Sequence, residues 1–233
     1  MSRLASDPEH RVQFARRIAA GDASLRLYAI LDAESCARRQ LDPLAVARGW
    51  RQNGVRLMQY RDKQGSDADV VSVARQLGSI FQHDPDALLL LNDRAHLVAH
   101  LVAQFGWHGV HLGQGDLPVA QARVLVGDGA LIGISTHSAD QALAANAFDV
   151  DYVAIGPVFA TTTKVDAEPA VGVCGVQAAR AVTRRPLVAI GGIGSARAGV
   201  VRAAGADMVA AISALLPVAG EVDPVAEFFR AMR

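Results

Sequence analysis

The sequence predicts an α/β fold, namely a single-domain (β/α)8 TIM barrel with a short N-terminal extension. Short apolar runs alternate with longer amphipathic stretches, eight of each, in units of roughly 25 residues. The apolar runs are nearly continuous, which is typical of parallel strands that are covered on both faces. No Pro- or Ser-rich linker interrupts the alternation. An open, doubly wound sheet is the alternative architecture.

The elements follow one another regularly along the chain. The predicted strands are Leu27–Leu31, Arg56–Tyr60, Leu88–Leu91, Gly109–Leu112, Leu131–Ser135, Tyr152–Gly156, Leu187–Ile190 and Met208–Ile212. The predicted helices lie near Leu44–Gln52, Asp67–Phe81, Ala95–Phe105, Pro118–Val126, Ala139–Ala147, Val176–Val182, Ala196–Ala204 and Pro224–Met232. Residues 1–24 are predicted to form a helical or loose extension, and residues 25–233 the catalytic barrel.

Composition excludes several classes of function. The 23 basic and 23 acidic residues cancel, so no general attraction to nucleic acid or anionic lipid is expected. No apolar run reaches the roughly 18 residues of a membrane span. Asp7 and Glu9 interrupt the N-terminal arginines, which argues against a targeting signal. Cys36 and Cys174 lie far apart without metal-site spacing, so we expect a cytoplasmic protein, and a homo-oligomer is compatible with the sequence.

In a barrel of this kind, chemistry is expected at the carboxyl ends of the strands. The second strand ends in Gln59, Tyr60, Arg61, Asp62 and Lys63. Because side chains alternate along an extended chain, the amide and the two cations share one side. Two cations beside an amide indicate an anion site, and the alternative is a solvated strand end.

The sequence contains only two lysines, Lys63 and Lys164. Both fall in loops that follow predicted strands, at the end of the barrel that we call its mouth. Lys164 follows Thr161, Thr162 and Thr163 after the sixth strand. Three hydroxyls and an ammonium group in one loop suit a phosphate. A Schiff base at Lys164 is the alternative, and it would require burial of the amine.

Aspartates follow two predicted strands that are adjacent in the barrel. Asn92 and Asp93 follow the third strand, and Asp116 follows the fourth. Neighbouring strands lie about 5 Å apart, so the two aspartates could share Mg²⁺ together with phosphate oxygens and waters. The alternative is that either aspartate caps the following helix. His111, inside the fourth strand, is interpreted as a core or supporting side chain.

The remaining strand ends carry ligand-binding signals. Ser135 and His137 follow the fifth strand without a triad pattern, which favours hydrogen bonding to a ligand over hydrolysis. Gly192 lies in a glycine run after the seventh strand, and Ile212 and Ser213 end the eighth. Loops at these two positions commonly donate backbone N–H groups to a phosphate.

Seven motifs occur in the order of these strands: QYRDK, LND, HLGQGD, GIS, GPVFATTTK, IGGI and AIS. Together they resemble the thiamine-phosphate synthase family from about Leu27 to Leu215. The resemblance implies a TIM-type barrel that joins 4-amino-2-methyl-5-hydroxymethylpyrimidine diphosphate to a thiazole phosphate, carboxylated or not. It implies a Mg²⁺-dependent transfer of the pyrimidinylmethyl group, with thiamine phosphate and diphosphate as products.

The resemblance also implies residue roles. The implied pyrimidine diphosphate ligands are Gln59, Arg61, Lys63, Asn92 and Lys164, with Tyr60 and Asp62 in the same motif. Asp93 and Asp116 would bind Mg²⁺, and Ser135 would lie by the reacting diphosphate. The implied thiazole phosphate ligands are Thr161, Thr162, Thr163, Gly192, Ile212 and Ser213. Arg61, Lys63, Ser135 and Lys164 are the implied catalytic side chains.

Two positions depart from the family pattern: Asp62 replaces a frequent Glu, and Ala160 stands where a Pro is common. Three other functions stay open. A thiazole tautomerase would share the fold and the phosphate site, but the intact QYRDK and TTTK segments argue against it. A non-catalytic binding barrel would not require both aspartates beside the cations. An aldolase would use Lys164 as a Schiff base.

Overall fold

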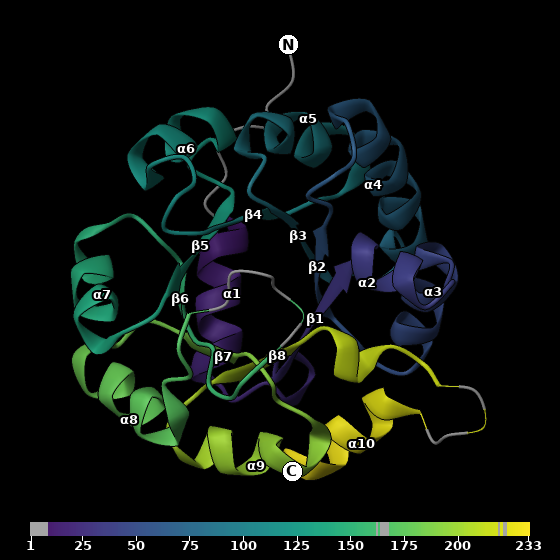
Figure 1. Cartoon of the computed structure of the whole chain (residues 1–233). Helices are drawn as coiled ribbons and strands as arrows, with labels where there is room; N and C mark the ends of the chain where they lie inside the picture. The colour runs from purple at the N-terminus through teal and green to yellow at the C-terminus, as the bar shows by residue number, and fades with distance from the viewer. Residues whose placement is uncertain (1–8, 162, 164–167, 219, 221–222) are drawn as a thin grey trace.

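The computed structural model is a closed barrel of eight parallel strands, so the predicted fold class is confirmed (Figure 1). The structure describes residues 9–161, 163, 168–218, 220 and 223–233. The strands are β1 (Leu27–Asp32), β2 (Leu57–Arg61), β3 (Leu88–Asn92), β4 (Gly109–Leu112), β5 (Leu131–Thr136), β6 (Tyr152–Ile155), β7 (Leu187–Ile190) and β8 (Met208–Ala211). They follow chain order, and β8 pairs with β1 to close the barrel.

The helices other than α1 and the short α2 form the outer ring of the barrel (Figure 1). In chain order, the helices are α1 (Glu9–Ala19), α2 (Ala33–Arg38), α3 (Pro43–Gln52), α4 (Asp67–Phe81), α5 (Ala95–Phe105), α6 (Val119–Val126), α7 (Ala139–Ala144), α8 (Gly172–Val182), α9 (Ser195–Ala203) and α10 (Pro224–Ala231). Short 3₁₀ turns occupy Ala23–Leu25, Ala145–Ala147 and Ser213–Leu215. No helix among the described residues is both long and apolar enough to cross a membrane.

The predicted elements differ from the structure mainly where local pattern is weak. Each strand end lies within one residue of its predicted position. Helix α8 begins at Gly172, earlier than the predicted Val176. The glycines in its first turn have low helix propensity, so the sequence pattern does not indicate this turn. Helix α2 was not predicted, since six residues are too few to show a helical period. Its first turn is fixed by Asp32, whose carboxylate accepts from the Ser35 N–H at 2.9 Å.

Side-chain alternation along the strands divides the core into two layers. One cluster fills the inside of the barrel and includes Tyr28, Leu90 and Tyr152. The other lies between the strands and the helix ring and includes Tyr60 and Leu91. Residues two apart share a face of a strand. The same alternation therefore directs the last inward-facing residues of each strand toward the mouth.

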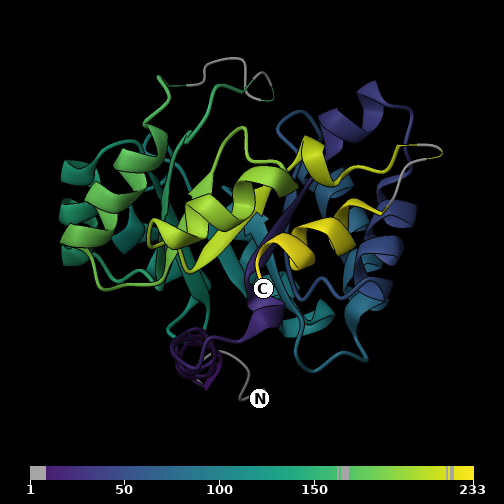
Figure 2. The ribbon, with the colours of Figure 1, turned by 90° about the horizontal axis from the view of Figure 1, so that it is seen from below.

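Helix α1 lies across the end of the barrel opposite the loops that follow the strands (Figure 2). Phe14 is 1% exposed and belongs to the interior cluster, where its ring lies 6.0 Å from that of Tyr152. The N-terminal segment thus contributes a helix that covers the base of the interior core. Its assignment as a unit separate from the barrel stays a prediction.

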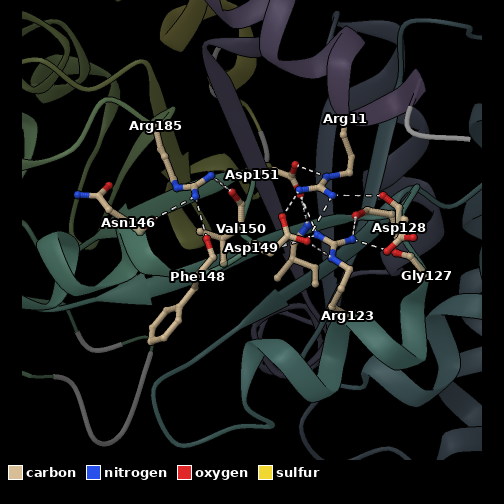
Figure 3. Close-up of polar contacts among 12 residues, drawn as sticks. Arg11, Arg123, Gly127, Asp128, Asn146, Phe148, Asp149, Val150, Asp151 and Arg185 are labelled. Carbon is tan, nitrogen blue, oxygen red and sulfur yellow. Dashed lines mark hydrogen bonds and ion pairs between the residues drawn. The ribbon is translucent and has the colours of Figure 1, made fainter.

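Arginines and aspartates fix α1 to the barrel (Figure 3). Arg11 donates from Nε to Asp151 at 2.7 Å and from Nη2 to Asp149 at 2.5 Å. Arg123 of α6 pairs with the same Asp149 at 2.8 Å. Asp151 also accepts from the Ile132 N–H at 2.7 Å, so this carboxylate joins α1 to β5.

Asp151→Asn is expected to lower the free energy of unfolding by about 2 kcal/mol, because it removes a buried charge that pairs with Arg11 and, at 3.5 Å, with Arg123. The side chain of Asp151 is 8% exposed, whereas that of Asp149 is 53% exposed. Asp149→Asn, the matched control, should cost less than about 1 kcal/mol. Urea denaturation of the two variants measures the difference, and equal losses would contradict the anchoring role of Asp151.

His108 makes stability depend on pH. Its Nδ1 accepts from the Leu89 N–H at 3.2 Å, and its ring meets that of His10 edge-on at 5.1 Å. Burial, together with the charge of His10, lowers the pKa of His108 from 6.5 to about 4. Between these values the unfolded chain binds a proton that the folded chain does not, so stability decreases as the pH is lowered.

From about pH 7 to about pH 5 this residue should cost about 2 kcal/mol of stability. His108→Asn keeps an acceptor near Leu89 and has no titratable group in this range. Its stability should therefore change less over the same interval, as denaturation at both pH values will show. A parallel pH profile in the variant would remove His108 as the cause.

Candidate active site at the carboxyl ends of the strands

The first half of the mouth gathers cations and amides. Gln59 and Arg61 share the inward face of β2, since Leu57 on that face belongs to the interior cluster. Asn92 ends β3 on the face of Leu88 and Leu90. The structure therefore brings together three of the sequence-predicted diphosphate ligands.

Arg61 is held by a carboxylate that the sequence reasoning missed. Its guanidinium contacts Asp32 at the end of β1, and the Asp32 side chain is 1% exposed. Asp32 also caps α2 through Ser35. One arginine–carboxylate contact leaves further guanidinium N–H groups for an anion. The sequence signal that could have identified Asp32 is its position as an aspartate at the end of a strand.

Lys63, Asp93 and Asp116 form one charged group. The Lys63 ammonium donates to Asp93, and the carboxyls of Asp93 and Asp116 are hydrogen-bonded to each other. Burial and the bond to Asp116 raise the pKa of Asp93 to about 6. For Asp116, burial acts to raise the pKa, but the bonds from Asp93 and the Gly113 N–H lower it overall. Two carboxyls this close share a proton unless a cation lies between them.

Neither aspartate caps a helix, so the helix-cap alternative does not describe them. Pro118 and Arg94 occupy the N-cap positions of α6 and α5, without side-chain cap bonds. Asp116 instead accepts from the Gly113 N–H at 2.6 Å. Asp93 adopts a left-handed backbone, with φ 64°, an uncommon conformation for a non-glycine residue. Strain of this kind is typical of functional sites.

The second half of the mouth is a cavity of about 600 Å³. Its lining includes six of the predicted ligands: Ser135, Thr161, Thr163, Gly192, Ile212 and Ser213. The hydroxyls of Thr163 and Ser213 lie 3.5 Å apart, so the loops after β6 and β8 approach each other. Gly192 has φ 62°, and an added Cβ would lie 2.5 Å from the carbonyl oxygen of Ala160. Only glycine allows this close approach of the β7 and β6 loops.

Ser135 connects the two halves of the mouth. It lines the cavity, and its hydroxyl is 2.8 Å from Nε2 of His111 in β4. Gln114, on the loop that carries Asp116, donates to the Ser135 carbonyl at 2.6 Å. Gln114 and Arg39 line the cavity but were not predicted. Gln114 lies within HLGQGD and could have been singled out there, whereas no sequence signal pointed to Arg39.

Two further sequence-predicted residues, Tyr60 and Asp62, make structural contacts near the end of β2. Tyr60 belongs to the outer cluster, and its hydroxyl donates to Asp62 at 3.2 Å. Asp62 also accepts from the Gly65 N–H at 2.7 Å, so it closes the turn after β2. Thr162 and Lys164 lie outside the described residues.

The donor set suits a hard divalent cation bound jointly with a phosphate ligand. In the part of the chain that the structure describes, no three His, Cys, Asp or Glu side chains group to hold a metal ion. Mg²⁺, however, commonly uses one or two carboxylates and takes its other oxygens from phosphate and water. The pair Asp93 and Asp116 matches that requirement.

Comparisons with known proteins show the family to which this sequence and fold belong. The family model described as thiamine monophosphate synthase matches residues 27–215. A thiamine-phosphate synthase from Koribacter versatilis is 45% identical over 201 residues, covering 85% of this chain and 90% of the relative. One from Chloroflexus aurantiacus is 38% identical over 207 residues, covering 89% and 92%.

Among solved structures, a thiamine phosphate pyrophosphorylase from Pyrococcus furiosus superposes with a TM-score of 0.75 at 28% identity. The match covers 90% of this chain and 96% of that one. A native KDPGal structure, at a TM-score of 0.64 and 18% identity, shares the fold. The family match spans every strand of the barrel and the whole of the mouth described above. The chain therefore belongs to the thiamine monophosphate synthase family.

Proposed function

We propose that this chain joins 4-amino-2-methyl-5-hydroxymethylpyrimidine diphosphate to a thiazole phosphate and releases diphosphate. In this reaction the bond between the pyrimidine methylene carbon and the diphosphate oxygen breaks, and its electron pair leaves with diphosphate. The thiazole nitrogen lone pair forms the new C–N bond, which gives thiamine phosphate. The observation that carries the proposal is the position of Ser135, which lines a cavity of about 600 Å³ and whose carbonyl accepts from Gln114, on the loop that carries Asp116.

The cation-rich half would receive the diphosphate. Arg61 and Lys63 are positive groups already placed before reaction, and fixed charge of this kind stabilises a leaving anion. Lys164 is proposed to reach the same diphosphate. Gln59 and Asn92 would contact the pyrimidine diphosphate from the inward faces of β2 and β3.

The cavity would receive the thiazole phosphate. Thr161, Thr163 and Ser213 offer hydroxyl donors, and Gly192 lies just before the N-terminus of α9. Ile212, which is 9% exposed, supplies an apolar wall beside these donors. We propose Thr162 for the same loop on the basis of its position in the TTT run.

Asp93 and Asp116 would hold Mg²⁺. When bound there, the ion would neutralise charge that develops on the departing diphosphate. In the protein alone, Lys63 already balances part of the charge of this pair. The donor set thus supports a metal site that is completed by substrate.

Incubation of the protein with both phosphorylated heterocycles, with and without Mg²⁺, tests the proposal. We expect thiamine phosphate and diphosphate in equal amounts, and strong inhibition by a chelator. A thiazole tautomerase would yield neither product, and no feature of the described site favours that alternative. Absence of thiamine phosphate from the metal-containing reaction would reject the proposed function. Undiminished synthesis after chelation would reject the metal assignment.

A further inference from the structure

A continuous series of hydrogen bonds crosses the inside of the barrel below the mouth. Gln59 Nε2 donates to the Tyr28 hydroxyl at 2.8 Å, and that hydroxyl lies 2.8 Å from the hydroxyl of Tyr152. The Tyr152 hydroxyl lies 2.9 Å from Nδ1 of His111, whose Nε2 is 2.8 Å from Ser135 Oγ. The two ends are proposed substrate ligands, and Tyr28, Tyr152 and His111 connect them.

The series has a direction, because each member has few hydrogens to donate. The Gln59 amide nitrogen is only a donor, so the Tyr28 oxygen accepts from it. The one hydrogen of Tyr28 is then available to the Tyr152 oxygen, which leaves the Tyr152 hydrogen available to Nδ1 of His111. Burial raises the pKa of both tyrosines, which therefore keep their hydrogens. In a neutral imidazole whose Nδ1 accepts, the proton is on Nε2 and can be donated to Ser135.

We propose that Tyr28, Tyr152 and His111 are positioning residues that hold Ser135 Oγ as an acceptor toward the barrel interior. Its own hydrogen is then available at the mouth of the barrel as a donor for an anionic oxygen. The inference rests on the proposed function, since the departing diphosphate is the anion that Ser135 would meet. The opposite direction, with the Gln59 amide turned, would make Ser135 a donor to His111 instead.

Packing independently fixes the central members in place. Tyr28 and Tyr152 are at most 2% exposed, and His111 is 8% exposed. The Tyr152 ring stacks on His111, with centroids 5.5 Å apart, and meets Tyr28 edge-on at 5.9 Å. A Cβ at Gly133 would lie 2.0 Å from Cζ of Tyr152, so β5 leaves room for this ring through a glycine.

Tyr152→Phe tests the direction because it keeps the ring and removes the donor to His111 Nδ1. In the substrate-free wild-type protein, ¹⁵N NMR should show His111 protonated on Nε2. In the variant we expect a mixture of the two tautomers. We also expect kcat to fall about tenfold, with KM for the thiazole phosphate nearly unchanged, since only the serine donor is disturbed.

Two further variants separate positioning from a general structural effect. Tyr28→Phe leaves Tyr152 able to donate to His111, so it should change tautomer and kcat less than Tyr152→Phe. In a Ser135→Ala background, Tyr152→Phe should lower kcat no further, because the two substitutions disturb one interaction. An equal loss in that background would overturn the inference.

The NMR measurement also separates this inference from the proposed function. A wild-type His111 protonated on Nδ1 would overturn the direction of the series even if thiamine phosphate is made. Failure to make thiamine phosphate, with His111 protonated on Nε2, would reject the reaction and not the direction of the series.

Discussion

Asp93→Ala is expected to lower kcat by about a hundredfold or more, because it removes a carboxylate that contacts both Lys63 and Asp116. A single carboxylate would remain for Mg²⁺, and Lys63 would lose the partner that holds it. Initial rates measured at increasing Mg²⁺ concentrations should show two changes. More Mg²⁺ should be needed to reach half of the maximal rate, and the maximal rate should be lower. The expected loss of about 3 kcal/mol of transition-state stabilisation is large for one side chain.

Asp93→Asn is the matched variant, because it keeps the size of the side chain without its charge. It should be nearly as inactive as the alanine variant, while its stability stays close to that of the wild-type protein. Near-normal turnover in Asp93→Asn would contradict the metal role. It would leave Asp93 as a residue that only shapes the backbone after β3.

Arg61→Met is expected to cost about 3 kcal/mol of stability, because it leaves the buried Asp32 carboxylate without its cation. Turnover should fall about a hundredfold as well, since a positive charge facing the diphosphate is lost. These two effects have different causes. Urea denaturation and steady-state kinetics on the same preparations measure them separately.

The double variant Asp32→Asn/Arg61→Met distinguishes the two causes. Without a buried charge to compensate, most of the lost stability should return, because an asparagine oxygen can still accept from Ser35. Turnover should stay low, because the guanidinium is still absent. Recovery of activity along with stability would show that Arg61 only supports the fold.

The strands were the part of the fold that the sequence predicted well. Their apolar runs are nearly continuous, and each run ends abruptly in polar or glycine residues, as Leu91 does at Asn92. Helix α1 could not be placed beforehand, because its position depends on contacts distant in sequence. The Arg11–Asp151 ion pair spans 140 positions, and no local periodicity reveals such a pair.

The alternation of side chains along β2 explains which of its predicted site residues face the barrel interior and which do not. Gln59 and Arg61 were expected on one side of β2, and the structure places both on its inward face. Tyr60 lies between them in sequence and therefore faces the helices. Its predicted substrate contact came from the motif as a whole, which does not record which face each residue occupies.

The supporting residues were the least predictable. Asp32 acts through a partner on the neighbouring strand, and Tyr28 and Tyr152 lie opposite each other across the interior. Such contacts depend on strand register and barrel closure, which individual motifs do not encode. His111 was interpreted from sequence as a core or supporting side chain, and the structure gives it hydrogen bonds to Tyr152 and Ser135.

A crystal structure of the protein with thiamine phosphate, diphosphate and Mg²⁺ would test the central claim most directly. We predict that diphosphate will lie against Arg61 and Lys63, with the ion between it and the carboxylates of Asp93 and Asp116. The thiamine phosphate ester should occupy the cavity beside Thr163 and Ser213, with Ser135 between the two anions. Both anions in one half of the mouth, or an ion bound away from the two aspartates, would contradict the account.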